Sequence, residues 1–339
     1  MALCTELSHP NLIHLEEIML RERTISMVFE YAEHDLLQII QHHNSASKPI
    51  FWGVVRALLY QLLNGVLYLH KNWVVHRDLK PANIMVTSNG VVKIGDLGLA
   101  RLFRRPLKPL HDVDKVVVTI WYRAPELLLG SRHYTPAIDL WAIGCIFAEL
   151  LLLKPIFKGE EAKLDNKKSV PFQQNQMQKI VDILNLPSIR SWPNLVHHPE
   201  IPSLQSMTLS RAWQGSERGK SRLADWFQST LVESKQLQEI VRDPAAKETL
   251  VPGLRVLEGL FTYDPEKRLN AEAALSHPFF ASERASTSDN CFMVRGVPEK
   301  YPPRRVIIND EDLKSAGLPG SKRGGFPDDR PAKRAKEIP

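Results

Sequence analysis

The chain has 339 residues, of which 43% are hydrophobic and 24% are charged, and its net charge of +6 is the difference between 44 basic and 38 acidic residues. This ordinary globular composition suits one or two domains, and its basic excess, much of it near the carboxyl terminus, argues against a core that binds nucleic acid directly. The three cysteines lie far apart without a Cys-x-x-Cys pair, so neither a disulfide framework nor a zinc site is indicated.

The first elements predicted are a helix end and a hairpin. Residues 1–7 read as the last turns of a helix, which Ser8-His9-Pro10-Asn11 breaks. Ile13–Leu20 and Ile25–Tyr31 are predicted strands joined by the charged turn Arg21-Glu22-Arg23. A long amphipathic helix is then predicted by apolar residues at three- and four-residue intervals, namely Val54, Val55, Leu58, Leu59, Leu62, Val66 and Leu69.

The most informative stretch follows that helix, where charged and amide side chains stand between two short apolar segments. It reads His76-Arg77-Asp78-Leu79-Lys80-Pro81-Ala82-Asn83, and Asp96-Leu97-Gly98 and Ala124-Pro125-Glu126 come after it in that order. Seven of these positions are fixed in identity, namely His76, Arg77, Asp78, Lys80, Asn83, Asp96 and Gly98. At roughly 5% background each, that combination would occur by chance about once in 10⁹ placements. The other reading, a salt-bridged surface loop, leaves the apolar flanks and the second motif unexplained.

These motifs resemble those of the protein kinases. The resemblance implies an α+β, protein-kinase-like fold with a mainly helical carboxy-terminal lobe and a β-hairpin remnant of the amino-terminal lobe. The expected parts are residues 1–31, the lobe remnant; residues 32–281, the carboxy-terminal lobe with an insert; and residues 282–339, a mostly disordered basic tail.

By the same resemblance, ATP and Mg²⁺ are the cofactors. Asp78 would orient the attacking hydroxyl and accept its proton, Lys80 would offset charge on the phosphoryl oxygens, and Asn83 and Asp96 would supply the oxygen ligands that Mg²⁺ prefers. Nucleotide contacts are expected at the hinge, from Phe29, Glu30, Ala32, Asp35 and the adenine floor Met85. Phe29 and Met85 would equally serve as plain core residues.

Residues 117–126 resemble the cyclin-dependent kinases in particular. In that family Val118 and Arg123 would shape a pocket for a proline that follows the target serine or threonine. Asp114 stands where most relatives carry an activating phosphothreonine, so its carboxylate would hold Arg77 and Arg101. A solvated acidic loop residue is the alternative for Asp114.

The resemblance also assigns structural residues. Residues 137–153 are almost wholly apolar but carry Asp139 and Glu149, which indicates a buried helix and not a membrane span. Arg268 stands where family members pair an arginine with Glu126. Leu97 departs from the family's usual phenylalanine.

Further short segments, such as Glu33-His34-Asp35-Leu36 and residues 106–110, resemble those of fungal members of the Mediator-associated branch of the cyclin-dependent kinases. This branch implies a proline-directed serine/threonine kinase partnered by a cyclin C-like cyclin and the Mediator kinase-module subunits. Its expected substrates carry Ser/Thr-Pro sites, as in the RNA polymerase II carboxy-terminal domain and transcription factors. Basic clusters at residues 322–323 and 333–336 resemble a nuclear import signal, although they would equally suit a solvated tail.

The Gly-rich loop, strand lysine and helix glutamate of the family are not found before residue 7. We therefore expect the chain to lack most of the amino-terminal lobe and to bind Mg-ATP poorly. The alternative function is that of a catalytically impaired kinase, or pseudokinase, acting as an interaction scaffold. Direct contact with nucleic acid or a membrane is not expected.

Overall fold

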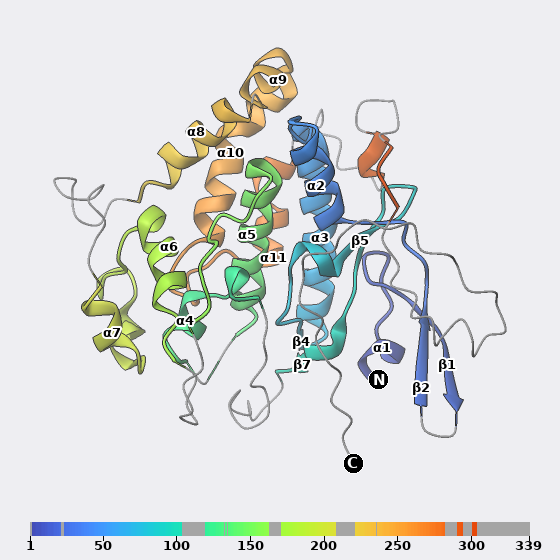
Figure 1. Ribbon diagram of the computed structural model, residues 1–339, viewed down its shortest axis with the longest axis horizontal. Coiled ribbons are helices and arrows are strands. Elements are labelled where there is room, and N and C mark those ends of the chain that lie inside the picture. The colour runs from blue at the N-terminus through green and yellow to red at the C-terminus, as the bar shows by residue number, and fades with distance from the viewer. Residues whose placement is uncertain are drawn as a thin grey trace, which may run out of the picture. The chain divides into compact units, whose positions relative to one another are not determined.

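The computed structural model describes residues 2–21, 24–103, 119–131, 133, 135–162, 171–207, 221–234, 236–281, 290–293 and 300–303. The chain divides after Arg304 into two compact units, and every described residue belongs to the first. Within this unit, helices surround one continuous hydrophobic core, and the strands are short (Figure 1).

The predicted helix end and hairpin are both present. Helix α1 covers Ala2–Glu6, and strands β1 (Leu15–Arg21) and β2 (Thr24–Phe29) pair antiparallel from Leu15↔Phe29 to Arg21↔Thr24. The segment before β1 bonds to strand β6 (Val92–Ile94) through the Ile13 amide and the Ile94 carbonyl, 2.9 Å apart. The hairpin is thereby fixed to the strand that precedes the Asp96 motif.

A three-stranded antiparallel sheet joins segments that are distant in sequence. Strand β3 (His34–Asp35) pairs with β5 (Ile84–Val86), which in turn pairs with β6. The register sets Asp35 opposite Met85 and Ile84 opposite Ile94. Two further short strands, β4 (Val74–Val75) and β7 (Arg101–Leu102), pair with each other. In the sequence, β4 directly precedes the His76 motif and β7 follows the Asp96 motif.

Two helices pack against the strands, and a third packs against one of these helices. Helix α2 covers Leu36–Ser45, α3 covers Trp52–Lys71, and α5 covers Ala137–Leu152. All seven apolar residues that predicted α3 are buried, which confirms the amphipathic assignment. Helix α5 packs against α3, α8 (Leu223–Glu233) and α10 (Pro244–Leu260) in Figure 1, so it is the buried helix that its apolar sequence predicts.

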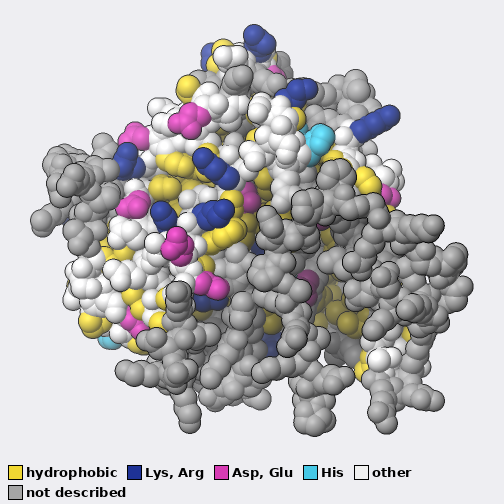
Figure 2. All heavy atoms as spheres, in the orientation of Figure 1, with side chains coloured by type: hydrophobic (Ala, Val, Ile, Leu, Met, Phe, Trp, Pro, Cys, Tyr) yellow, Lys and Arg dark blue, Asp and Glu magenta, His cyan; other side chains and the backbone are white. Residues whose placement is uncertain are grey.

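The remaining described α-helices have 11 residues or fewer. They are α4 (Pro125–Leu128), α6 (Gln174–Leu184), α7 (Ile201–Gln205), α9 (Gln236–Arg242), α11 (Ala271–Leu275) and α12 (Pro278–Ala281). None of the helices in the described ranges is both long and apolar enough to cross a membrane. On the face shown in Figure 2, exposed hydrophobic side chains are interspersed with charged ones.

The structure describes two short pieces of the expected tail. Two pieces of it, residues 290–293 and 300–303, contact the folded domain, and Cys291, Phe292 and Tyr301 are buried there. The sequence does not predict this docking, because two or three buried side chains suffice to hold such a segment and so few residues show no hydrophobic periodicity. The two basic clusters of the tail lie outside the described residues.

A buried polar pair lies between α5 and the turn before α4. The Tyr122 hydroxyl donates to Glu149 Oε2 over 2.6 Å, and Glu149 is only 2% exposed. Burial raises the pKa of Glu149 to about 7, an effect that the hydrogen bond from Tyr122 partly offsets. The folded state therefore favours the protonated carboxyl up to neutral pH.

We predict that Glu149→Gln removes a pH dependence of stability. The folded-state pKa of about 7 exceeds the reference value of 4.5, so the stabilisation is present below pH 4.5 and is lost as pH rises through 7. Between pH 5 and 8 the unaltered protein should lose about 2 to 3 kcal/mol relative to the variant, measured by urea unfolding. Glu272→Gln, at a 68% exposed side chain, is the control. Parallel stability curves for the protein and Glu149→Gln would contradict the assignment.

Candidate active site

A buried carboxylate organises the loop that carries Asp78. Asp139, on α5, is 1% exposed, and its two oxygens accept the His76 and Arg77 amides, each over 2.9 Å. The His70 ring adds a third bond, from Nε2 to Asp139 Oδ2 over 2.9 Å. Burial acts to raise the pKa of Asp139, but the hydrogen bonds from the His70 ring and the Arg77 amide outweigh burial and lower it.

His76 links this loop to the Asp96 motif. Its ring is fully buried, with Nε2 lying 2.9 Å from the Gly95 carbonyl and Nδ1 lying 3.3 Å from the Asp78 amide. A carbonyl only accepts and an amide N–H only donates, so Nε2 carries the proton and Nδ1 accepts. This single tautomer fixes the spacing between Asp78 and the residue before Asp96.

Asp78, Lys80 and Asn83 form one compact group. Asp78 is 6% exposed, and Lys80 Nζ lies 2.7 Å from its Oδ2. Asn83, in the 3-10 turn Pro81–Asn83, donates from Nδ2 to the Asp78 carbonyl over 2.8 Å and to Asp78 Oδ2 over 3.1 Å. The carboxylate is thus held by two neighbours and cannot rotate without losing both bonds.

Asp96 completes the group from the adjacent strand end. Its backbone is left-handed, with φ 56° and ψ 63°, and its exposed side chain accepts from the Gly98 amide over 3.3 Å. Aspartate tolerates this conformation better than most residues, and such strain of about 1 to 3 kcal/mol gathers at functional sites. The Gly95 amide, donating to the Asn83 carbonyl over 2.9 Å, ties Asp96 to the Asn83 turn.

The donor set fits Mg²⁺. Because Asn83 Nδ2 is occupied by two Asp78 oxygens, Oδ1 is the atom that can face a cation, beside the exposed carboxylate of Asp96. Both are hard oxygen ligands, as Mg²⁺ requires. In the part of the chain that the structure describes, no group of three His, Cys, Asp or Glu could hold a metal. Phosphate and water oxygens would supply the remaining ligands.

The predicted hinge residues lie on β2, β3 and β5 and in the segment that joins β2 to β3. Ala32 and Met85 are buried, whereas Phe29 and Glu30 are half-buried. A Cβ at Gly95 would meet the terminal methyl group of Met85, so that flexible side chain lies directly against the Gly95 backbone. The Asp35 side chain caps α2 by accepting from the Gln38 amide over 2.8 Å, so the expected ribose contact shares its carboxylate with a helix cap.

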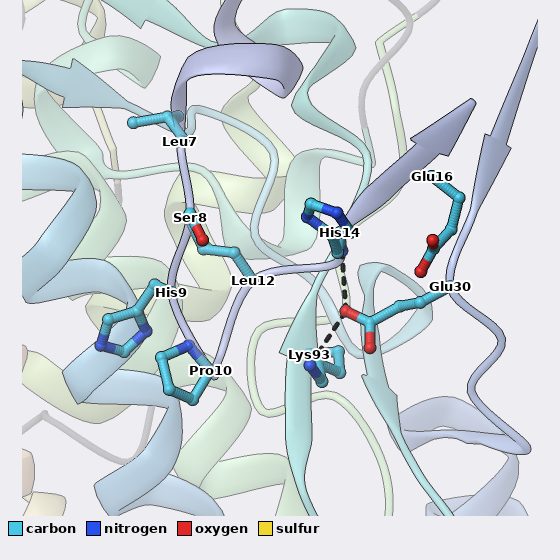
Figure 3. A pocket seen from close by; sticks show the side chains of 9 residues that line it. All are labelled: Leu7, Ser8, His9, Pro10, Leu12, His14, Glu16, Glu30 and Lys93. Atoms are coloured by element: carbon cyan, nitrogen blue, oxygen red, sulfur yellow. Dashed lines mark hydrogen bonds and ion pairs between the residues drawn. The ribbon is translucent and has the colours of Figure 1, made fainter. Parts of the chain in front are cut away.

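A cavity of about 350 Å³ has one of the predicted adenine contacts, Glu30, in its lining (Figure 3). It is lined by the segment from Leu7 to Glu16 together with Glu30 and Lys93, and Glu30 pairs with Lys93 Nζ over 2.9 Å. None of Asp78, Lys80, Asn83 or Asp96 lines it. We take the Asp78 group as the candidate active site, because the hydrogen-bonded carboxylate, ammonium and amide lie there and not in the cavity.

The predicted regulatory and substrate residues are only partly described. Arg77 has a left-handed φ of 72°, and Arg101 is exposed on β7, where it pairs with Val75. Burial lowers the pKa of Arg123, an effect that the charges of Glu161 and Asp78 partly offset. Asp114 and Val118 lie outside the described residues.

The predicted Glu126–Arg268 pair is confirmed. Arg268 Nη1 and Nη2 each donate to one Glu126 oxygen over 2.8 Å, and both side chains are at most 4% exposed. Such a bidentate pair anchors α4, which carries the Ala124-Pro125-Glu126 motif, to the segment after α10. Sequence reasoning missed the roles of His70, the His76 ring and the Tyr122–Glu149 pair, because their partners are 19 to 69 residues away.

Known proteins resemble the chain throughout. Residues 1–280 match the protein kinase domain family. The serine/threonine-protein kinase SSN3 of Phaeosphaeria nodorum is 57% identical over 99% of this chain and 76% of its own length. The serine/threonine-protein kinase ssn3 of Emericella nidulans is 56% identical over 99% and 78%. A crystal structure of the yeast RNA Pol II CTD kinase CTDK-1 complex has a TM-score of 0.64, at 30% identity, over 83% of this chain and 79% of that one.

The chain therefore belongs to the protein kinase family. The site and the relatives identify it as a serine/threonine kinase similar to the fungal SSN3 proteins, which confirms the resemblance found from the motifs. The expectation that most of the amino-terminal lobe is missing is not confirmed by these comparisons, in which nearly the whole chain aligns.

We predict different effects for the two carboxylates. Asp78→Asn should lower the turnover number about 10²- to 10⁴-fold with nucleotide affinity nearly intact, because proton acceptance and not phosphate binding is lost. Asp96→Asn should weaken both, since it would remove a carboxylate expected to bind Mg²⁺. The measurements are peptide phosphorylation and calorimetry with Mg-ATP, with Asp225→Asn on α8 as a control variant. Equal losses of nucleotide affinity in the two variants would refute this division of roles.

Proposed function

We propose that the chain is a proline-directed serine/threonine kinase that transfers phosphate from ATP to Ser/Thr-Pro sites. The observation that carries this proposal is the group of Asp78, Lys80 and Asn83, held beside Asp96 by His76 and the Gly95 backbone. Its carboxylate, ammonium and amide are the side chains that phosphoryl transfer to a hydroxyl requires.

Each residue of the group has a separate role. Asp78 orients the substrate hydroxyl and accepts its proton, and Lys80, which contacts Asp78 Oδ2, balances charge on the transferred group. Asn83 Oδ1 and the Asp96 carboxylate would hold Mg²⁺, whose chemistry is to neutralise phosphate charge. The hinge residues bind the adenine and ribose. Positioning of the reacting groups and electrostatic stabilisation of the phosphate charge provide most of the rate enhancement.

Substrate choice is proposed to rest on a proline pocket formed by Val118 and Arg123. The charges of Glu161 and Asp78 act on the Arg123 guanidinium and partly offset the lowering of its pKa by burial, which supports a pocket that adjoins the proposed catalytic carboxylate. The solved structure at 30% identity is described as an RNA Pol II CTD kinase, which supports a carboxy-terminal domain of RNA polymerase II as one substrate. Asp114 would replace an activating phosphate by pairing with Arg77 and Arg101.

The proposed partners are a cyclin C-like cyclin and the Mediator kinase-module subunits. A solved relative that forms a complex supports a partnered kinase, and the similarity to SSN3 supports this branch of the family. Nuclear import through the basic clusters at residues 322–323 and 333–336 belongs to the same proposal.

The test is a pair of peptides that differ at one position. With its cyclin bound, the kinase should phosphorylate a Ser-Pro peptide at least tenfold more efficiently than the matched Ser-Ala peptide, because only proline lacks the amide hydrogen that the pocket leaves unpaired. Asp78→Asn serves as the inactive control. Equal turnover of the two peptides would refute proline direction, and no turnover of either would favour the scaffold alternative.

A further inference from the structure

The two described pieces of the carboxy-terminal segment contact the strand and turn beside the nucleotide contacts. The Pro302 carbonyl lies 2.9 Å from His34 Nδ1, and the Tyr301 hydroxyl lies 3.0 Å from His43 Nε2. The Cys291 amide donates to the Gly90 carbonyl over 3.0 Å. These contacts span more than two hundred residues of sequence.

The hydrogen bonds define the tautomers at this contact. The Pro302 carbonyl only accepts, so His34 Nδ1 must donate. His43 Nδ1 lies 3.2 Å from the Lys48 carbonyl and must also donate, so its Nε2, when the ring is neutral, accepts from the Tyr301 hydroxyl. Each partner is therefore matched to its neighbour, as in a formed interface and unlike a loosely collapsed tail.

Aromatic packing and a glycine reinforce the contact. The Phe292 and Tyr301 rings are 5.0 Å apart, and the His34 ring meets both edge-on at 5.8 and 6.1 Å. Gly90, with φ 72°, accommodates the segment closely, since a Cβ there would lie 2.8 Å from the Cys291 amide nitrogen. Such ring pairs add about 0.5 to 1.5 kcal/mol beyond the area they bury.

The location gives the contact its consequence. His34 directly precedes Asp35, and the register of β3 with β5 sets Asp35 opposite Met85, the expected adenine floor. Gly90 lies in the turn between β5 and β6, the strands that lead from Asn83 and to Asp96. A segment fixed to both points limits the movement of the strands that carry the nucleotide contacts.

We propose that residues 290–293 and 300–303 act as a strap in which Phe292 and Tyr301 are positioning residues for nucleotide binding. The strap acts through His34 and the β5–β6 turn. This inference rests on the proposed nucleotide site, and it predicts that affinity for ATP depends on side chains in the carboxy-terminal segment.

The test compares variants of the full chain with its cyclin. Tyr301→Ala should raise the KM for ATP about threefold to tenfold, the ratio that one ordinary hydrogen bond represents, with kcat within about twofold. Tyr301→Phe keeps the ring and loses only the bond to His43, so it should lie between Tyr301→Ala and the unaltered chain. Met293→Ala, at a 43% exposed side chain on the same segment, should change nothing.

Amide hydrogen exchange provides a readout that does not require catalysis. Tyr301→Ala should speed exchange in β3 and α2, and calorimetry with Mg-ADP should show the same loss of affinity as the KM. An unchanged KM and affinity in Tyr301→Ala, or a fall in kcat alone, would overturn the strap. If Tyr301→Ala does not fold, an unchanged KM in Tyr301→Phe overturns it.

Failure of the proposed function gives a different result. A chain that binds Mg-ADP in a Tyr301-dependent way but transfers no phosphate would contradict the kinase assignment and support the strap. A chain that transfers phosphate with a Tyr301-independent KM would do the reverse, and a chain that binds no nucleotide would overturn both.

Discussion

The loop that carries Asp78, the proposed catalytic carboxylate, is held by a side chain from α5, which lies 63 residues beyond His76 in the chain. Asp139 accepts two consecutive backbone amides, from His76 and Arg77, which a single carboxylate can do because it offers two acceptor oxygens. Arg77 has a left-handed φ, and the hydrogen bond from its amide to Asp139 offsets the strain of that conformation. The Asp78 group, the His76 bridge and the Asp96 turn all depend on that loop conformation.

Burial of this carboxylate is affordable only because it is fully paired. Asp139 is 1% exposed and receives three hydrogen bonds, two from amides and one from His70. An unpaired carboxylate at the same depth would be protonated or would destabilise the fold by several kcal/mol. The chain therefore uses the hydrophobic helix α5 as a rigid support for a few polar contacts, and the same helix supplies Glu149 for Tyr122.

Much of this arrangement follows from the sequence. The buried α5, the amphipathic α3 and the hairpin are readable from periodicity, because each has one dominant pattern of apolar residues. The Glu126–Arg268 pair was available only through the family resemblance, since the partners are 142 residues apart. The His70 and His76 bonds and the docking of Tyr301 were missed, because nothing local in the sequence specifies a partner brought near by the tertiary fold.

The central claim is that Asp139 sets the backbone of the catalytic loop, and Asp139→Asn tests it most directly. Asparagine keeps one acceptor oxygen and replaces the other with a donor, so one of the two amides must lose its partner. The account predicts that amide exchange at His76 or Arg77 becomes at least about tenfold faster, the ratio expected for loss of a bond to a charged group, and that phosphoryl transfer falls with it. Exchange and transfer both unchanged in a folded Asp139→Asn protein would contradict the account.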